Sequence, residues 1–307
     1  QVEQASARTG GRPPRIIISG GGTGGHVFPA IAIADAIVEA APAAELLFVG
    51  ARDKIEMEKV PKAGYPIEGL WISGFHRKLT WRNLAFPIKL LSSLWRARAI
   101  LRQFRPDVVV GVGGFASGPV LEMAGRLGIP TLIQEQNSYA GVTNRLLAGK
   151  AACICVAYEG MERYFPAEKI VLTGNPVRRD LQAPAATRAA AAAHFGLDPE
   201  RPLCFVFGGS LGARSINEAI VANHEALAER SEVQWLWQTG KLYADTFGAS
   251  ATAGLPNVTA RTFIDRMDLA YALADVVICR AGALTLSELA LVGKPAILIP
   301  SPNVAED

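Results

Sequence analysis

The residue of this sequence best suited to acid–base chemistry is a histidine at the start of a predicted helix. His26 ends the run GGGTGGH, which follows the apolar residues 15–19 and precedes a helical pattern over residues 29–41. The unperturbed pKa of histidine, about 6.5, suits proton transfer at neutral pH. The positive end of a helix would tend to keep the imidazole neutral, as a base should be. We expect His26 to act as a general base; the alternative is that it hydrogen-bonds only the loop or a phosphate.

The glycines before His26 could form an anion site. Glycine lets the backbone adopt a positive φ and approach a ligand closely, and the helix that follows offers unpaired N–H groups. Gly20, Gly22 and Gly25 also match the GxGxxG pattern of dinucleotide sites, but such sites need an acid where the next predicted strand ends at Gly50. We therefore do not predict NAD binding. The alternative interpretation is a turn that only permits close packing of helix and strand.

Three further glycine-containing stretches end a predicted strand and begin a predicted helix. They lie at residues 111–119, 207–215 and 279–288. The carboxyl ends of parallel strands share one edge of a sheet, where α/β proteins bind their ligands. Together with the loop before His26 these make four glycine loops, which predict a ligand with phosphates and many hydroxyl groups.

The elements that must position these loops alternate between strand and helix. Strands are predicted at residues 15–19, 45–50, 107–113, 131–135, 152–157 and 169–174, and then at 203–208, 233–238, 257–261, 275–280 and 295–300. Helices are predicted at residues 29–41, 83–103, 117–127 and 141–149. Runs of Val, Ile and Leu without polar alternation are typical of strands buried on both faces, as in parallel sheets covered by helices.

The pattern restarts after an Asn-Pro pair and an Ala/Pro-rich stretch, which indicates a domain boundary. Each half then opens with the same strand, glycine loop and helix, and 307 residues suit two domains of ordinary size. We predict an α/β protein with two Rossmann-like domains facing each other across a cleft. The N-terminal domain covers residues 15–174, the junction 175–187 and the C-terminal domain 188–307.

Composition argues against several classes of protein. With a net charge of only +3, we expect no nucleic-acid partner. The sequence contains no run of 18 uncharged apolar residues, so we expect no membrane-spanning helix. The polar first 15 residues are typical of a disordered leader rather than a secretion signal. The four cysteines lie in apolar runs without metal-ligand spacing, so we expect buried thiols in a reducing cytoplasm and no metal site.

Six motifs in order resemble one glycosyltransferase family. They are GGTGGHVFPA, GVGGFASGP, QEQN, GNPVR, GGSLGA and RAGALTLSE, and the resemblance runs from about residue 15 to the last residue. Together they are similar to the MurG family, which adds N-acetylglucosamine from UDP-GlcNAc to the membrane precursor lipid I, forming lipid II in peptidoglycan synthesis. The resemblance implies a GT-B fold, with lipid I on the N-terminal domain and UDP-GlcNAc mainly on the C-terminal domain. The alternatives are another GT-B enzyme, such as a UDP-GlcNAc 2-epimerase, and a non-catalytic nucleotide-sugar binding protein.

The resemblance also implies which residues contact the donor. Carried over by motif, these are Thr23, Gly24, Gly25, Asn137, Arg178 and Ser210. Ile264 is implied as the uracil contact through its backbone, and Ala283, Leu284, Thr285, Leu286, Ser287 and Glu288 are implied as the phosphate and ribose contacts. Two alternatives stay open: Arg178 could form a hinge salt bridge, and Glu288 could complete a capping box with Thr285.

The family resemblance further implies inversion at the anomeric carbon, with direct attack by the acceptor's 4-hydroxyl and help from a general base. Glu135, at a predicted strand end, competes with His26 for that role. No paired acids follow a strand, so we expect helix N-termini and Arg178 to neutralise the diphosphate without a metal or cofactor. Phe115 stands where the family often has tyrosine, so chemistry that needs a hydroxyl there is absent.

Residues 74–104 interleave Trp, Leu and Ile with lysine and arginine. This mixture is typical of a helix that lies in a membrane interface, although an ordinary surface helix packed on the sheet is the alternative. We predict a peripheral protein that contacts the anionic cytoplasmic face of the bacterial inner membrane through this stretch. The family pattern continues past Asp307 with an HQxxNA-type segment and a closing helix, and whether the chain is active without them stays open.

Overall fold

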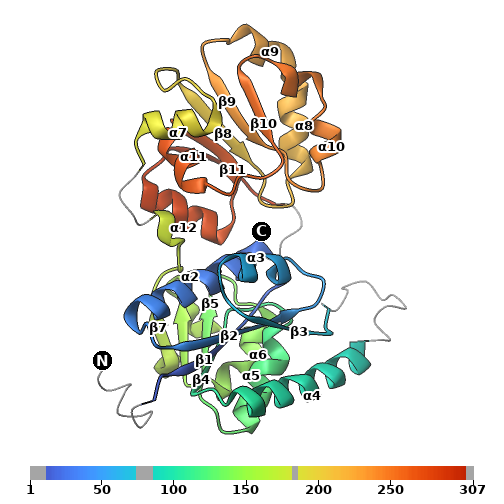
Figure 1. The fold of residues 1–307 in the computed structure, drawn as a ribbon, viewed down its shortest axis with the longest axis vertical. Helices are drawn as coiled ribbons and strands as arrows, with labels where there is room; N and C mark the ends of the chain where they lie inside the picture. Colours follow the sequence, from blue (N-terminus) through green and yellow to red (C-terminus); the bar gives the residue numbers. More distant parts are fainter. Residues whose placement is uncertain (1–11, 74–85, 182–185, 302–307) are drawn as a thin grey trace. The chain divides into compact units, whose positions relative to one another are not determined.

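The computed structural model describes residues 12–73, 86–181 and 186–301. The chain divides into two compact units, the first ending at Arg178 and the second beginning at Arg179. This division falls inside residues 175–187, the stretch that the sequence singles out as a junction. Each unit is a parallel β-sheet with helices on both of its faces (Figure 1).

The first unit contains a seven-stranded sheet in the order β3-β2-β1-β4-β5-β6-β7. The strands are β1 (Arg15–Ser19), β2 (Glu45–Ala51), β3 (Ile67–Leu70), β4 (Val108–Gly111), β5 (Thr131–Glu135), β6 (Cys153–Val156) and β7 (Ile170–Leu172). The order reverses between β1 and β4, which pair in parallel. The loops after these two strands therefore flank the position where open α/β sheets bind ligands.

Helices cover both faces of this sheet (Figure 1). Those on one face are α2 (Gly24–Ala40) and α3 (Glu56–Lys62), and those on the other are α4 (Phe86–Phe104), α5 (Ser117–Arg126) and α6 (Val142–Leu147). Successive strand residues point to opposite faces. Ile16 and Ile18 accordingly pack in the apolar cluster under α2, while Ile17 packs in the cluster under α4 and α5.

The second unit contains a five-stranded sheet in the order β10-β9-β8-β11-β12. The strands are β8 (Leu203–Phe207), β9 (Gln234–Gln238), β10 (Val258–Arg261), β11 (Val276–Arg280) and β12 (Ala296–Ile299). One face carries α7 (Arg188–Phe195), α11 (Met267–Leu273) and α12 (Ala283–Val292), and the other carries α8 (Arg214–Ala222), α9 (His224–Glu229) and α10 (Ala244–Phe247). The order reverses between β8 and β11, so the loops after these strands occupy the ligand-binding position of this unit.

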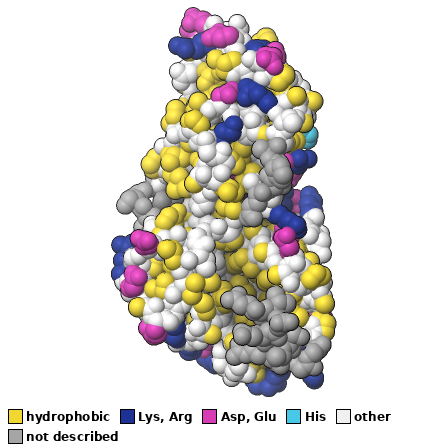
Figure 2. Space-filling model, turned by 90° about the vertical axis from the view of Figure 1, so that its left-hand side faces the viewer, with side chains coloured by type: hydrophobic (Ala, Val, Ile, Leu, Met, Phe, Trp, Pro, Cys, Tyr) yellow, Lys and Arg dark blue, Asp and Glu magenta, His cyan; other side chains and the backbone are white. Residues whose placement is uncertain are grey.

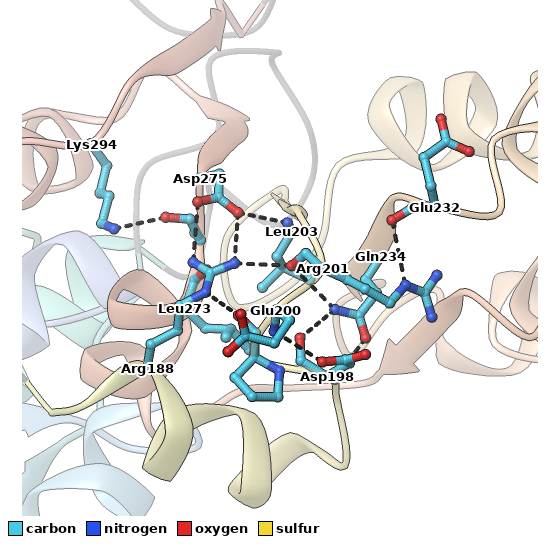
Figure 3. Close-up of polar contacts among 12 residues, drawn as sticks. Arg188, Asp198, Glu200, Arg201, Leu203, Glu232, Gln234, Leu273, Asp275 and Lys294 are labelled. Atoms are coloured by element: carbon cyan, nitrogen blue, oxygen red, sulfur yellow. Dashed lines mark hydrogen bonds and ion pairs between the residues drawn. The ribbon is translucent and has the colours of Figure 1, made fainter.

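The amino-terminal edge of the second sheet is fixed by Arg188, the first residue of α7 (Figure 3). Its guanidinium donates hydrogen bonds to the carbonyl oxygens of Leu273 (2.7 Å), Pro199 (2.6 Å) and Arg201 (2.9 Å) and forms a 2.9 Å ion pair with Asp275. Partial burial by itself would raise the pKa of Asp275, but hydrogen bonds from Arg188 and a main-chain amide outweigh it and hold that pKa below its usual value. This cluster joins α7 to the sheet.

The predicted class, two α/β units with parallel sheets, is confirmed. The strands lie within two residues of their predicted ends, but the sequence did not predict β3 or α3, and α2 begins at Gly24 rather than residue 29. Within the three described ranges, no helix has the length and apolar character needed to cross a membrane. On the face drawn in Figure 2, basic and acidic side chains lie beside one another, as the small net charge suggests.

Candidate active site

Two glycine loops of the first unit, those after β1 and β4, pack directly against each other. A Cβ atom on Gly114 would overlap the carbonyl oxygen of Gly21, and one on Gly22 would lie 2.9 Å from the ring of Phe115. All three glycines have positive φ values. Close packing therefore accounts for these glycines, as in the alternative interpretation of the sequence: Gly114 packs on backbone, and Gly22 and Gly21 pack on the side chains of Phe115 and Glu56.

Glu56, which the sequence did not single out, holds the first glycine loop from its other side. Its side chain is 1% exposed, and its two oxygens lie 3.1 and 3.0 Å from the amide nitrogen of Gly22. One oxygen also accepts a hydrogen bond from the amide of Ala51 (3.0 Å). One amide of the loop that was expected to bind anions is thus already paired with a carboxylate of the protein itself.

The first main-chain amides of α2 are not paired in the way that the amide of Gly22 is. Thr23 is the residue before the helix and has extended backbone angles, and its side chain makes no capping hydrogen bond. Among the described residues, no acceptor pairs with the amides of Gly24 and Gly25. A helix of 17 residues therefore presents unpaired N–H groups at the carboxyl edge of the sheet, where they can bind a negative group.

His26 lies in the first turn of α2 and between the two glycine loops. Its Nδ1 atom is 3.2 Å from the hydroxyl oxygen of Thr23, and its Nε2 atom is 3.0 Å from the position of a Cβ on Gly113. Burial lowers the pKa of His26 to about 4. The imidazole is therefore neutral at pH 7 and able to accept a proton.

Arg178 brings a positive charge to the same end of α2. Its guanidinium carbon lies 5.7 Å from the centre of the Phe28 ring, two residues after His26. A guanidinium over an aromatic face is held there by a cation–π interaction. The structure therefore places a cation beside the helix terminus within the first unit.

Glu135 is fully engaged in its own loop. The side chain is 1% exposed and accepts hydrogen bonds from the amides of Asn137 (3.1 Å) and Gly141 (2.9 Å). The side-chain amides of Asn137 (3.3 Å) and Asn144 (2.9 Å) donate to it as well. These four donors join the carboxylate to the loop after β5, so the side chain of Glu135 holds this loop in shape.

Asn144 is a polar residue near His26 that sequence reasoning missed. Its side-chain nitrogen lies 3.7 Å from the Cβ position of Gly113, close to the imidazole. Its side-chain oxygen is buried and has no hydrogen-bond partner among the described residues. Buried acceptors are normally paired, so this oxygen is an exception next to the glycine loop.

In the second unit, the loop after β8 carries Ser210. The following helix α8 begins at Arg214 with Ala213 as its N-terminal flanking residue, so Ser210 does not cap it. The carbonyl oxygen of Ser210 accepts a hydrogen bond from the amide of Lys241 (3.2 Å), which ties this loop to the one after β9. Ser210 is half-buried at the carboxyl edge of the sheet.

The loop after β11 leads into α12. This helix begins at Ala283 after Gly282, so Thr285 lies in its first turn instead of preceding it, and the capping box with Glu288 is not formed. Glu288 is 8% exposed and accepts a 3.1 Å hydrogen bond from the hydroxyl of Tyr271. The capping alternative for Glu288 is therefore wrong.

Arg280 is a cation at the carboxyl edge of the second sheet, and it was not predicted from the sequence. It is the last residue of β11, two positions before Gly282, and it donates a 2.7 Å hydrogen bond to the hydroxyl of Ser215. Its position next to a helix N-terminus marks the same edge of the sheet as electropositive. An arginine directly before a glycine loop could have been noticed as a possible phosphate contact.

Ile264 is buried, and its two main-chain groups differ in their partners. The amide donates a 2.7 Å hydrogen bond to the side-chain oxygen of Gln238, whereas no donor among the described residues pairs with the carbonyl oxygen. A backbone contact from Ile264 to a ligand is therefore open at its carbonyl.

Three large apolar side chains are exposed on α4. Ile88, Leu91 and Trp95 are 63%, 59% and 72% exposed and share one side of the helix, while Ala97 and Leu101 are buried against the sheet. Lys89 lies 5.7 Å from the ring centre of Trp71, which is itself exposed. The rest of the predicted membrane stretch, residues 74–85, lies outside the described residues.

Each unit thus has an electropositive sheet edge suited to phosphate, and the first adds a neutral imidazole. In the part of the chain that the structure describes, no three His, Cys, Asp or Glu side chains gather as metal ligands would. A sheet edge of this kind can neutralise a phosphate group, and a neutral imidazole can accept a proton.

Comparison with known families covers both units. The N-terminal domain of glycosyltransferase family 28 matches residues 16–156, and the C-terminal domain of the same family matches residues 203–307. A Bacteroides fragilis protein named UDP-N-acetylglucosamine--N-acetylmuramyl-(pentapeptide) pyrophosphoryl-undecaprenol N-acetylglucosamine transferase is 57% identical over 295 residues, 95% of this chain and 78% of that protein. A Cytophaga hutchinsonii protein of the same name is 56% identical over 301 residues, 96% of this chain and 79% of its own length.

Solved structures are similar as well. The crystal structure of MurG from Acinetobacter baumannii matches with a TM-score of 0.66 and 30% identity over 95% of this chain and 80% of that one. A UDP-GlcNAc 2-epimerase from Neisseria meningitidis, bound to UDP-GlcNAc, matches with a TM-score of 0.63 over 92% of this chain and 82% of that one. At 12% identity, this second likeness concerns the fold alone.

Proposed function

The chain belongs to glycosyltransferase family 28, and we propose that it transfers N-acetylglucosamine from UDP-GlcNAc to the MurNAc 4-hydroxyl of undecaprenyl-pyrophosphoryl-MurNAc-pentapeptide (lipid I), forming lipid II. The observation that carries this conclusion is 57% identity, across both family domains, to a transferase named for that donor and acceptor. The protein is a UDP-GlcNAc-dependent glycosyltransferase of peptidoglycan synthesis.

The second unit is the proposed site of the nucleotide. The loop containing Ser210 and the first turn of α12, from Ala283, would contact the phosphates, with Arg280 adding a positive charge at the same edge. The carbonyl of Ile264 would accept a hydrogen bond from uracil, and the carboxylate of Glu288, which is held by the hydroxyl of Tyr271, would accept from the ribose hydroxyls. These contacts favour UDP as a leaving group because they neutralise the charge that develops on its diphosphate.

The first unit is the proposed site of the base. His26 is neutral at pH 7 because burial lowers its pKa to about 4, so it can take the proton of the attacking hydroxyl as the new glycosidic bond forms and the bond to UDP breaks. Attack from the face opposite the diphosphate inverts the anomeric carbon. The open amides of Gly24 and Gly25, together with Thr23 and Arg178, would bind a phosphate group near the reacting centre.

Glu135 and Asn137 take a different part in this proposal. The four hydrogen bonds to the Glu135 carboxylate hold the loop that carries Asn137. Asn137 would contact the donor sugar through its amide, and Glu135 would keep it in place. This assignment replaces the idea that Glu135 itself accepts the proton.

The exposed apolar side chains on α4 support a peripheral contact with an anionic membrane surface. Ile88, Leu91 and Trp95 would enter the interface while the nearby lysine and arginine side chains face lipid phosphates. An acceptor with an undecaprenyl anchor requires the enzyme to work at such a surface. We propose that the protein lies on the cytoplasmic face of the inner membrane.

Turnover with a short-chain lipid I analogue tests the proposal. UDP-GlcNAc and the analogue should yield UDP and the disaccharide product, detected by mass spectrometry. Conversion of UDP-GlcNAc to its 2-epimer without an acceptor would instead indicate an epimerase. UDP-GlcNAc binding without either product would indicate a binding protein.

A further inference from the structure

Gln238, the last residue of β9, connects two loops of the second unit. It is 3% exposed, and both ends of its side-chain amide are used. The nitrogen donates a 3.0 Å hydrogen bond to the carbonyl of Gly209, and the oxygen accepts a 2.7 Å hydrogen bond from the amide of Ile264. Since a carbonyl can only accept and an amide N–H can only donate, these two partners fix which way the glutamine amide points.

The two loops that Gln238 joins are those proposed above to contact opposite ends of the nucleotide. Gly209 directly precedes Ser210, on the phosphate side, and has a φ of +90°. Ile264 is the proposed base contact. The neighbouring segment adds further ties, because the amide of Thr239 bonds the carbonyl of Arg261 and that of Lys241 bonds the carbonyl of Ser210.

We propose that Gln238 is a positioning residue for donor binding: it sets the spacing between the phosphate loop and the base loop before the nucleotide arrives. This inference rests on the proposed donor site. Ordering two loops in advance removes an entropic cost that the ligand would otherwise have to overcome. The residue acts through Gly209 and Ile264 and touches no reacting atom.

The chemistry of the side chain makes a sharp test possible. Gln238→Glu keeps the length and the acceptor for Ile264 but replaces the donor to Gly209 with a carboxylate oxygen, which repels that carbonyl. Gln238→Leu removes both hydrogen bonds: the buried amide of Ile264 loses its partner, and the carbonyl of Gly209 keeps only the 3.0 Å hydrogen bond from the amide of Gly212. Both changes should let the two loops move relative to each other.

Gln234 provides a matched control on the same strand. It is also 3% exposed, and its side-chain amide also bridges main-chain groups, accepting from the amide of Asp198 (2.8 Å) and donating to its carbonyl (2.8 Å). Gln234 begins β9, whereas Gln238 ends it, and Figure 3 shows Gln234 near the Arg188 and Asp275 cluster. Its loss should affect folding as much as the loss of Gln238, without touching the donor loops.

The experiment compares Gln238→Glu, Gln238→Leu, Gln234→Glu and Gln234→Leu in the full chain. Affinity for UDP is measured by calorimetry, KM for UDP-GlcNAc and kcat by turnover, and stability by thermal melting. We expect the Gln238 variants to raise Kd for UDP and KM for UDP-GlcNAc by about tenfold or more, with a smaller change in kcat. The Gln234 variants should melt at similarly reduced temperatures yet keep Kd for UDP within about twofold.

Equal UDP affinities in the folded Gln238→Glu and Gln234→Glu variants would overturn the positioning role. So would a fall in kcat without any change in Kd or KM. If the unchanged protein itself fails to bind UDP, the proposed donor site fails first and the role of Gln238 fails with it. If the unchanged protein binds UDP, the comparison of the two glutamines concerns the inference alone.

Discussion

The imidazole of His26 lies over Gly113, with Nε2 3.0 Å and Cδ2 2.9 Å from the position that a Cβ atom on this glycine would take. Gly113→Ala should therefore push the imidazole out of place and strain a backbone with φ of +90°. Because small displacements of catalytic groups are costly, we expect kcat to fall by about 10- to 100-fold, with a smaller effect on UDP affinity. Turnover kinetics and calorimetry measure the two quantities.

Gly128→Ala is the control for this substitution. Gly128 also has a positive φ, +73°, but nothing lies within 4 Å of its Cβ position. The free energy of unfolding of the Gly128→Ala variant should fall by about 1 kcal/mol, and its kcat should not change. Equal effects of the two substitutions on kcat would contradict the role given to the His26–Gly113 contact.

His26→Ala should lower kcat by about 10²- to 10⁴-fold and affect affinity for UDP-GlcNAc much less. In the unchanged protein, activity should fall on the acid side with a pKa of about 4, because the base is lost only when His26 is protonated. Folding should also weaken as the pH falls from 6.5 toward 4, since the unfolded chain binds the proton more readily there.

His224→Ala offers a comparison, because this histidine contacts Thr252 in the second unit, away from the glycine loops. Its kcat and its pH profile should match those of the unchanged protein. An acid limb near pH 6.5 would contradict the lowered pKa of His26. Equal losses of kcat and donor affinity in His26→Ala would assign His26 to binding instead of proton transfer.

Glu56→Gln should loosen the first glycine loop. The substitution replaces an oxygen that accepts from Gly22 or Ala51 with an NH₂ group, which cannot accept from either amide. We expect the free energy of unfolding to fall by about 1–3 kcal/mol, because a buried hydrogen bond is lost. We also expect a lower kcat, because His26 lies only four residues after Gly22 in the loop that Glu56 holds. Denaturant unfolding and turnover kinetics check both effects.

Glu58→Gln, on the same helix, separates this effect from a general loss of charge. Glu58 is exposed and pairs with Lys62 at 3.0 Å, so its loss should change stability by less than about 0.5 kcal/mol and leave kcat unchanged. If both glutamates behave alike, the buried carboxylate has no special part in holding the loop.

Arg188→Ala should destabilise the second unit by about 2 kcal/mol, because three main-chain carbonyls and Asp275 lose their shared donor. The part of this stabilisation that comes from the ion pair with Asp275 should depend on pH. Its folded pKa lies below 3.8, so its contribution is present above that pH and is lost as the pH falls through the lowered value. Thermal melting between pH 2 and 7 measures this.

Arg214→Ala removes an exposed pair with Glu218 in the same unit and should change stability by less than about 0.5 kcal/mol. A stability difference between Arg188→Ala and the unchanged protein that persists without decrease to pH 2 would show that Asp275 adds nothing to the cluster.

Replacing Leu91 and Trp95 together by serine should weaken binding to vesicles that contain phosphatidylglycerol by about tenfold or more, because both side chains are exposed on α4. Binding of the unchanged protein should also weaken as salt is added. Leu242→Ser removes a side chain that is 67% exposed in the second unit and should leave vesicle binding unchanged. Equal binding by all three proteins would exclude α4 as the membrane contact.

The sequence predicted the sheets well because buried parallel strands consist of uninterrupted runs of Val, Ile and Leu. It missed β3, whose four residues IEGL include a glutamate and a glycine, and the short helix α3. The glycine loops were found from their motifs, but which glycines pack and which leave amides open depends on distant residues. Glu56, Gln238 and Asn144 are defined by contacts that no local pattern encodes.

The capping box shows the same limit on a smaller scale. Thr285 and Glu288 have the spacing of the motif, yet the helix begins at Ala283, so the threonine cannot occupy the position before it. A shift of a few residues in a helix start changes the role of every polar side chain near it. The pattern of residue types was correct, and only the register was not.

The carboxylate of Glu56 has a consequence for inhibitor design. Because it already satisfies the amide of Gly22, a phosphate mimic aimed at that turn would have to displace a buried charged side chain before it could bind. Compounds that place their negative group at the amides of Gly24 and Gly25 would meet no such competitor within residues 12–73, 86–181 and 186–301. The productive point of attack in this lobe is thus the first turn of the helix.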